Sequence, residues 1–338
     1  MSLLKKSFVL VFVLYFALSC LAFAGSQKTK YTIRFAHGLP PTHRIATNNF
    51  NYFKNLVEQE SGGQIAVKLF PSGQLVDDKH VLGAVKNGSI EACAIYSFYI
   101  VRTCPSFAIF TTPMVFHNTQ ETIDAIEGPI GKELFTKLEK KGYMPLGWVV
   151  WAQDIMGIEC KSPVHVPLDL EGKVIRPLSS QQALYLKEYC HAQSAFVTGA
   201  ELYTALQRGT IDGTDASLEH AVDRKLSEVA PYFCVLPGMP VVNEVIFVNK
   251  RFFNRLPRNL QNVLKKAALQ TQQHSYEVAH KIAKEITQKA KACMKEVYYP
   301  TSNDLKLWYA SIDDFFKRAL KNNPDALRLV MMERKQQK

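Results

Sequence analysis

The sequence predicts an α/β protein built of two lobes, with one long helix lying along both. Short apolar strands alternate with amphipathic helices through the first half of the chain, which is typical of sheets covered by helices. Residues 257–296 contain no glycine, and their apolar residues recur at three- and four-residue steps. A helix of that length spans about 55 Å, which is longer than one lobe. The 338 residues are also enough for two lobes.

The N-terminal stretch predicts a signal peptide over residues 1–24. Lys5 and Lys6 provide the positive start, an apolar run follows, and Ala22-Phe23-Ala24 has the small residues of a cleavage site. Cleavage after Ala24 leaves 338 − 24 = 314 residues, exported to the periplasm. Cys20 offers a lipoprotein alternative, although the three residues before it match a lipidation site poorly.

Composition narrows the function classes. The net charge of +11 falls to about +9 without the two leader lysines, and a basic protein could bind nucleic acid. However, no basic run is interleaved with aromatic residues, so no nucleic-acid partner is expected. The histidines form no metal-binding pair, and no nucleophile or phosphate-binding motif is present, so the sequence predicts no enzyme, no metal and no cofactor. Six cysteines remain in the mature chain. Their pairing stays open, and Cys93 is expected to be a buried thiol.

The first lobe is expected to comprise residues 25–152 and 241–281. Its predicted elements are a strand over 31–36, a helix over 45–60, a strand over 65–70, a helix over 77–87 and a strand over 90–95. Alternation of this kind indicates a largely parallel sheet with ligand loops along one edge. His37 ends the first strand and Tyr96 follows the third, so both are candidate ligand contacts.

The second lobe is expected to comprise residues 153–240 and 282–338. An apolar run over 146–151 crosses into it, and a strand over 241–248 returns. Its predicted elements are a strand over 173–176, a helix over 181–190, a strand over 195–197 and a helix over 201–208. Pro177 ends the first of these strands and leaves Arg176 at its carboxyl end. The fork of donors on a guanidinium suits a carboxylate or another planar anion.

Several motifs occur together in one order. Gly172-Lys-Val-Ile-Arg176 is followed by Glu201-Leu-Tyr-Thr-Ala-Leu-Gln-Arg-Gly-Thr-Ile-Asp-Gly213, and Phe70-Pro-Ser-Gly-Gln-Leu75 precedes both. The sequence thereby resembles the DctP-like solute receptors of TRAP transporters, over nearly the whole mature chain. The resemblance implies a two-lobed periplasmic binding protein fold with a long helix across both lobes.

Two positions depart from the pattern of that family. Met156 stands where many relatives have a second arginine, and Ala216, next to Asp215, stands where many have an asparagine that reaches the ligand. The anion must then be satisfied by other groups, for which the candidates are Gln153, Thr198, Gly199, Thr214 and Ser217. Alternatively Arg102 or Lys161 supplies the second cation. The departures favour a monoanion with an apolar or weakly polar tail over a C4-dicarboxylate or a sialic acid.

The resemblance implies a monomeric receptor that captures a small carboxylate or sulfonate between its lobes and delivers it to the TRAP membrane permease. It implies no catalysis. The alternatives are a solute-binding protein of the ABC type, against which the long helix argues, and a secreted hydrolase, for which no catalytic constellation is seen. Neither the ligand nor the permease can be read from the sequence.

Overall fold

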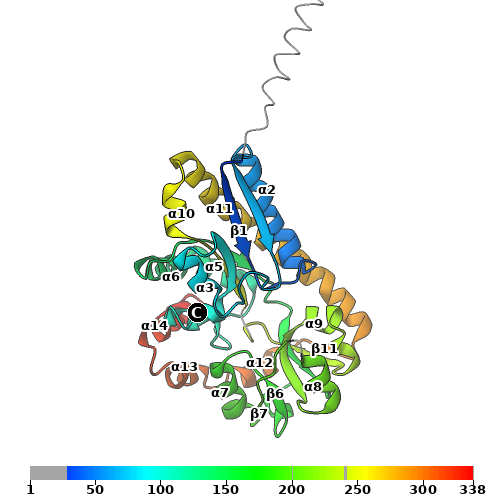
Figure 1. Ribbon diagram of the computed structural model, residues 1–338. Helices are drawn as coiled ribbons and strands as arrows, with labels where there is room; N and C mark the ends of the chain where they lie inside the picture. Colours follow the sequence, from blue (N-terminus) through cyan, green and yellow to red (C-terminus); the bar gives the residue numbers. More distant parts are fainter. Residues whose placement is uncertain (1–28, 200, 240–241, 338) are drawn as a thin grey trace, which may run out of the picture.

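The computed structural model describes residues 29–199, 201–239 and 242–337, and it confirms the two-lobed α/β fold (Figure 1). The predicted leader, residues 1–24, lies outside the described residues. Each lobe is built on one sheet with helices on its faces. Within the described residues, we find no helix with the length and apolar character of a membrane span.

The five-stranded sheet of the first lobe has the order β2-β1-β3-β10-β4. Its strands are β1 (Tyr31–Ala36), β2 (Ile65–Phe70), β3 (Ala92–Tyr96), β4 (Pro145–Val150) and β10 (Asn243–Val248). The sheet is largely parallel, as predicted: β2, β1, β3 and β4 run in one direction, and β10, which returns from the second lobe, pairs antiparallel with both β3 and β4. Its start pairs with the ends of its neighbours, Glu244 with Tyr96 and Asn243 with Val150. All the loops that adjoin the second lobe therefore meet at one edge.

The six-stranded sheet of the second lobe has the order β11-β9-β5-β8-β6-β7. Its strands are β5 (Met156–Cys160), β6 (Val174–Arg176), β7 (Gln193–Ser194), β8 (Gly213–Ser217), β9 (Tyr232–Val235) and β11 (Glu296–Tyr298). This sheet is mixed too, since β5 runs antiparallel to β8 and β9. The strand predicted over 195–197 lies instead at 193–194. Its partner β6 stops at Pro177, which has no N–H to continue the ladder.

Helices cover both sheets. The first lobe carries η1 (Ala46–Phe50), α2 (Asn51–Glu60), α3 (Val81–Asn87), α4 (Ser97–Ile100), η2 (Pro105–Phe110), α5 (Thr119–Glu127), α6 (Pro129–Lys140) and α10 (Lys250–Arg255). The second carries η3 (Pro167–Leu170), α7 (Ser180–Tyr189), α8 (Leu202–Arg208), α9 (Leu218–Asp223) and η4 (Leu226–Glu228). The helix predicted over 77–87 begins only at Val81, because the Asp77 carboxylate accepts from the backbone and ring of His80 and holds a turn there.

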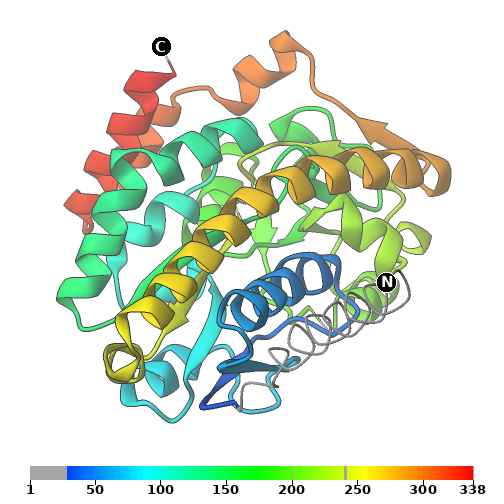
Figure 2. The same ribbon diagram turned by 90° about the horizontal axis from the view of Figure 1, so that it is seen from above.

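The predicted long helix is α11 (Arg258–Cys293), whose 36 residues span about 54 Å. It crosses the molecule diagonally over both lobes (Figure 2). Two of its side chains bond the edge strand β4 of the first lobe. Gln272 Oε1 accepts from Trp148 N at 3.0 Å, and Ser275 Oγ accepts from Val150 N at 3.0 Å. Further along, α11 packs against α9 of the second lobe.

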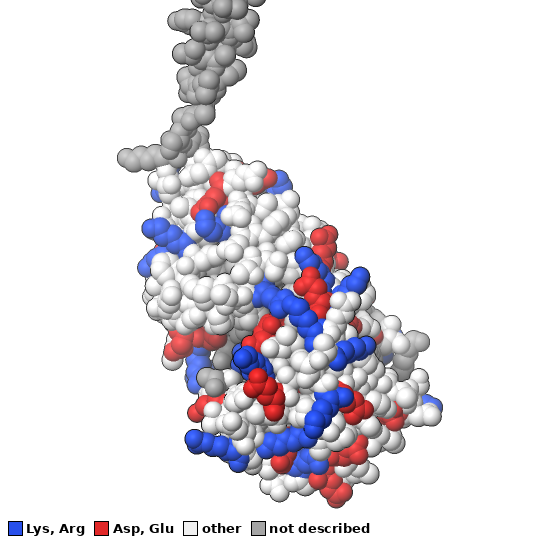
Figure 3. Space-filling view, turned by 90° about the vertical axis from the view of Figure 1, so that its right-hand side faces the viewer, with Lys and Arg blue, Asp and Glu red and all other residues white. Residues whose placement is uncertain are grey.

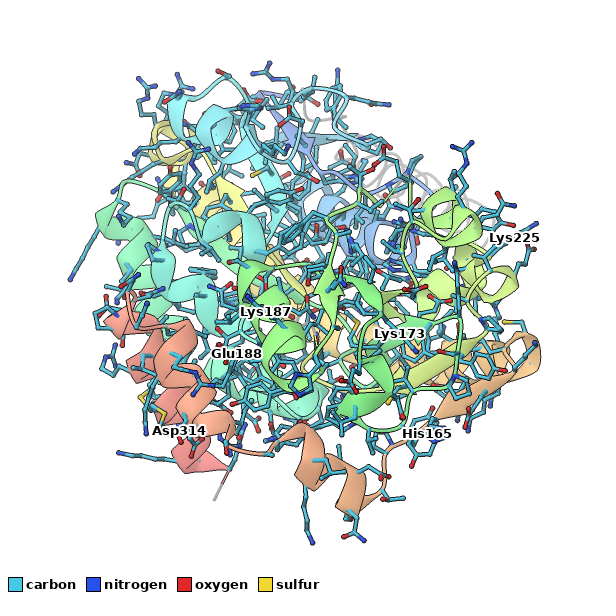
Figure 4. The ribbon with its side chains drawn as sticks, turned by 90° about the horizontal axis from the view of Figure 1, so that it is seen from below. His165, Lys173, Lys187, Glu188, Lys225 and Asp314 are labelled. Carbon is cyan, nitrogen blue, oxygen red and sulfur yellow. The ribbon has the colours of Figure 1, made fainter. Side chains whose placement is uncertain are left out.

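The C-terminal segment forms α12 (Ser302–Trp308), α13 (Ile312–Ala319) and α14 (Pro324–Gln336). Helix α13 lies beside α7, where Arg318 contacts Glu188 at 2.8 Å; Glu188 and Asp314 mark the two helices in Figure 4. Helix α14, in contrast, packs against η2 of the first lobe, and Asn323 Nδ2 at its start donates to Pro105 O at 2.8 Å. The expected assignment of all of 282–338 to the second lobe therefore does not hold for α14, since the chain crosses back after α13.

Charges of both signs are interspersed over the lower part of the face in Figure 3. The described residues of this face form no extended patch of one sign. Among the six described cysteines, five are buried and none is bonded to another, and Cys93 is a buried thiol of β3, as expected.

The second crossing between the lobes contains a close backbone contact at Gly238. Its φ is +85°, and a Cβ there would lie 2.0 Å from Phe116 O. We therefore expect Gly238→Ala to lower the free energy of unfolding by about 2–4 kcal/mol, combining the left-handed backbone with overpacking. Gly172→Ala is the matched control, because Gly172 has a φ of +73° but no heavy atom within 4 Å of the position that a Cβ would occupy. Urea unfolding measures both, and equal losses would contradict the steric account.

Candidate functional site

A cavity of about 400 Å³ lies where the facing edges of the two sheets meet. Its walls come from loops at strand ends in both lobes. The first lobe contributes Gly38, Leu39, His43, Asp78, Tyr96, Phe98, Trp151 and Val242; the second contributes Met156, Arg176, Leu178, Gly199, Leu202, Ala216, Ser217, His220 and Arg224. Six of the predicted site residues are thus brought together: Tyr96, Met156, Arg176, Gly199, Ala216 and Ser217.

Arg176 lines the cavity at the end of β6, where Pro177 stops the strand. Its Nε donates to Val197 O at 2.9 Å, which fixes the plane of the guanidinium. Among the described residues, no protein group accepts from its two terminal nitrogens, so these remain available to a ligand. Burial lowers the pKa of Arg176, and the nearby carboxyl of Asp215 opposes that effect.

Asp215 was expected in the site but is buried in β8 and does not line the cavity. Burial raises its pKa well above the usual value, although the charge of Arg176 acts in the opposite direction. Asp215 is therefore a buried carboxyl of the second sheet, outside the cavity lining.

A second cation, Arg224, lines the cavity from the residue that follows α9. Its Nη1 donates to Gly199 O at 2.9 Å, so it is tied to the loop before α8. Sequence reasoning missed this residue and named Arg102 or Lys161 instead, neither of which lines the cavity. Arginines are common at the C-terminal ends of helices, because their charge interacts favourably with the helix dipole. The sequence position of Arg224 therefore did not indicate a ligand-binding role.

The two histidines of the cavity add no positive charge at neutral pH. Burial, with a contribution from Arg224, lowers the pKa of His43 to about 4 and that of His220 to about 3. The positive charge of the cavity at neutral pH therefore comes from Arg176 and Arg224, both on the wall of the second lobe.

The wall of the first lobe carries a carboxylate, Asp78, which sequence reasoning did not select. It lies directly over the backbone of Gly38, where a Cβ would approach Asp78 Oδ2 to 2.2 Å. Burial is the main cause that raises the pKa of Asp78, followed by the charge of Asp77. Only a glycine at position 38 leaves room for this carboxylate in the wall.

Aromatic rings complete the wall of the first lobe. Trp151 is 7% exposed and lines the cavity. Its ring centroid lies 5.7 Å from that of Tyr96 and 5.1 Å from that of His43. Its Nε1 donates to the buried Glu244 at 3.4 Å, and burial raises the pKa of Glu244 to about 8.

Four further predicted residues lie outside the cavity lining, one of which is Thr214, buried in β8 with its Oγ1 donating to Asp215 O at 2.9 Å. His37 is buried against Phe50, with ring centroids 4.7 Å apart, while the next two residues reach the cavity. Thr198 Oγ1 donates to Glu201 at 2.7 Å and helps to start α8. Gln153 Nε2 donates to Trp151 O at 2.7 Å and to Val242 O at 3.0 Å, so this buried amide joins the two chain crossings. A buried amide needs such partners, which are found here on the backbone.

No cluster of three or more histidine, cysteine or acidic side chains suited to a metal ion occurs in the part of the chain that the structure describes.

Two lobes with a cavity between their sheet edges, spanned by one long helix, define a solute-binding protein. The model of the bacterial extracellular solute-binding proteins of family 7, DctP, matches residues 35–323, and the chain belongs to this family.

Named relatives have similar lengths. The C4-dicarboxylate-binding periplasmic protein DctP of Rhodobacter capsulatus is 28% identical over 265 residues, which are 78% of this chain and 77% of that protein. The 2,3-diketo-L-gulonate-binding periplasmic protein YiaO of Escherichia coli is 26% identical over 287 residues, 84% of each chain. A TRAP periplasmic solute-binding protein of Ochrobactrum anthropi has the same fold, with a TM-score of 0.82, 24% identity and coverage of 92% and 97% of the two chains.

Proposed function

We propose that the protein is the periplasmic receptor of a TRAP transporter and captures a small organic anion between its two lobes. The observation that carries this proposal is the pair of arginines in a cavity between the lobes, one of them oriented by Val197 O. Membership of the solute-binding family and the ligands named for its relatives support it. The protein performs no chemistry on the ligand, acts as a monomer and delivers the ligand to a membrane permease.

The preferred ligand carries one anionic group rather than two. Met156 and Ala216 line the cavity and offer no charge. Arg224 restores the second cation that the sequence lacked at position 156, so the number of cations no longer disfavours dicarboxylates. Asp78 disfavours dicarboxylates instead, because its carboxylate on the opposite wall repels the second carboxylate of such a ligand. Both arginines then share one carboxylate or sulfonate.

Ligand capture closes the two lobes. Between them Arg44, in the helical turn that leads into η1, donates to Asp223 of α9 at 3.2 and 3.3 Å and lies 3.7 Å from Glu285 of α11. Ligand contacts drive closure only through the difference in affinity between the open and closed states. Exposed pairs of this kind contribute about 1 kcal/mol or less, so the ligand supplies most of the stabilisation of the closed form.

The test is a thermal-shift panel followed by small-angle scattering. We expect monocarboxylates or sulfonates to raise the melting temperature more than C4-dicarboxylates do, because a ligand that binds only the folded state stabilises it. The ligand with the largest effect should then reduce the radius of gyration without changing the circular dichroism spectrum. A panel in which no organic anion stabilises the protein contradicts the proposal. A strong preference for dicarboxylates contradicts only the choice of a single anionic group.

A further inference from the structure

The two walls of the cavity carry opposite charges. Arg176 and Arg224 stand on the wall of the second lobe, and Asp78 stands on the wall of the first lobe. Among the described residues that line the cavity, Asp78 is the sole carboxylate. The neighbouring Glu244 is buried and does not line it, and its pKa of about 8 leaves it mostly protonated at neutral pH. A ligand between the walls therefore meets cations at one end and one anion at the other.

No partner within the described part of the chain explains the position of Asp78. Among the described residues, no side chain or backbone group donates a hydrogen bond to its carboxylate, and no cation forms an ion pair with it. The adjacent Asp77 differs, since it binds the ring of His80 at 2.8 Å on the protein surface. The surroundings of Asp78 include Tyr96 and Tyr99, whose pKa values its charge helps to raise. A ligand enclosed between the walls displaces water from this carboxylate, and a donor on the ligand would replace the lost hydrogen bonds.

We propose that the ligand carries an amino group bound by Asp78, together with the anionic group bound by Arg176 and Arg224. This inference rests on the proposed function and narrows its ligand class to zwitterions, that is, amino carboxylates or amino sulfonates. An ammonium group has three donors and no acceptor, and its charge cancels that of a carboxylate enclosed with it. A hydroxyl group donates only one hydrogen bond and leaves the carboxylate charged when the lobes close around it.

Matched ligands that differ in one group test the inference by calorimetry on the mature protein. The first set is 4-aminobutyrate, 4-hydroxybutyrate and butyrate, and the second is 2-aminoethanesulfonate and ethanesulfonate. We expect the amino member of at least one set to bind about tenfold or more tightly than its partners, the change expected for a charged hydrogen bond. A series from glycine to 5-aminovalerate then gives the spacing between the two charges that the cavity prefers. Hydroxybutyrate or the unsubstituted acids binding as tightly as the amino members would overturn the inference.

Asp78→Asn tests the assignment of the amino group to that residue. In this variant the ratio of affinities between the amino ligand and its unsubstituted partner should fall toward one. Asp77→Asn is the matched control, because it removes the same charge from the adjacent position outside the cavity, and it should keep the ratio of the wild type. An equal loss for both ligands in Asp78→Asn, with the ratio unchanged, would assign Asp78 a merely structural role. Wild-type protein that binds none of these anions contradicts the proposed function itself, whereas binding of the unsubstituted acids alone contradicts only the inference.

Discussion

Arg176→Lys is expected to weaken binding of the anionic ligand by about ten- to a hundredfold although the charge is kept. Two features of the wild-type side chain cannot be reproduced by an ammonium. The Nε of Arg176 donates to Val197 O at 2.9 Å, and this bond leaves the two terminal nitrogens in a fixed plane. Lysine has a single nitrogen on a flexible stem, so it can keep the backbone contact or reach the ligand, but cannot offer a paired fork.

Isothermal calorimetry with the best ligand of the thermal-shift panel measures this effect. Arg208→Lys is the matched control, because Arg208 is an exposed arginine at the end of α8 and lies outside the cavity lining. We expect its affinity to equal that of the wild type. Equal affinities for wild type and Arg176→Lys would reduce Arg176 to a general source of positive charge.

Glu244→Gln is expected to stabilise the protein, increasingly so as the pH rises. Burial raises the pKa of Glu244 from 4.5 to about 8, and the bond from Trp151 offsets only part of that effect. The folded protein therefore holds a proton that the unfolded chain releases above its ordinary pKa. The stability linked to this proton is complete below pH 4.5 and is lost as the pH rises toward 8. The full difference corresponds to about 5 kcal/mol, and glutamine avoids it while still accepting from Trp151.

Chemical unfolding of wild type and variant at pH 4 and at pH 8 tests this expectation. The two proteins should have nearly equal stability at the lower pH and differ most at the higher one. Other buried carboxyls, such as Glu219 with a pKa of about 7, titrate in both proteins and cancel in the difference. Glu139→Gln, on the exposed surface of α6, is the control and should not change stability with pH in this way. A gain that is the same at both pH values would show that packing, not charge, is responsible.

The sequence predicted the strands whose burial alternates and whose ends carry clear signals. β1 and β2 begin and end at the predicted residues. Each end of α11 lies within three residues of the predicted end. β8 was not predicted, because its residues, Gly213-Thr-Asp-Ala-Ser217, are all buried yet show no apolar pattern. The antiparallel course of β10 could not be predicted from its own residues either. Its direction depends on where the chain re-enters the first lobe.

The candidate site was predictable where a residue stands at a strand end with a local signal. Arg176 before a proline and Tyr96 at the end of β3 are of this kind, and both line the cavity. Asp78 and Arg224 were missed for a different reason. Asp78 belongs to a turn that the sequence presents as helix, and Arg224 lines the cavity from the residue that follows α9. Their roles depend on how the two lobes face each other, which no local pattern contains.

Two hydrogen bonds connect α11, on the outside of the protein, with β4, the strand that leads into the cavity wall. Strand β4 runs directly into Trp151, so the indole in the cavity wall and the bonded backbone of Trp148 and Val150 move as one piece of chain. A tilt of α11 must then either break these bonds or carry the indole with it. The outer helix is thus coupled, through two hydrogen bonds to backbone N–H groups, to the strand that leads into the cavity wall.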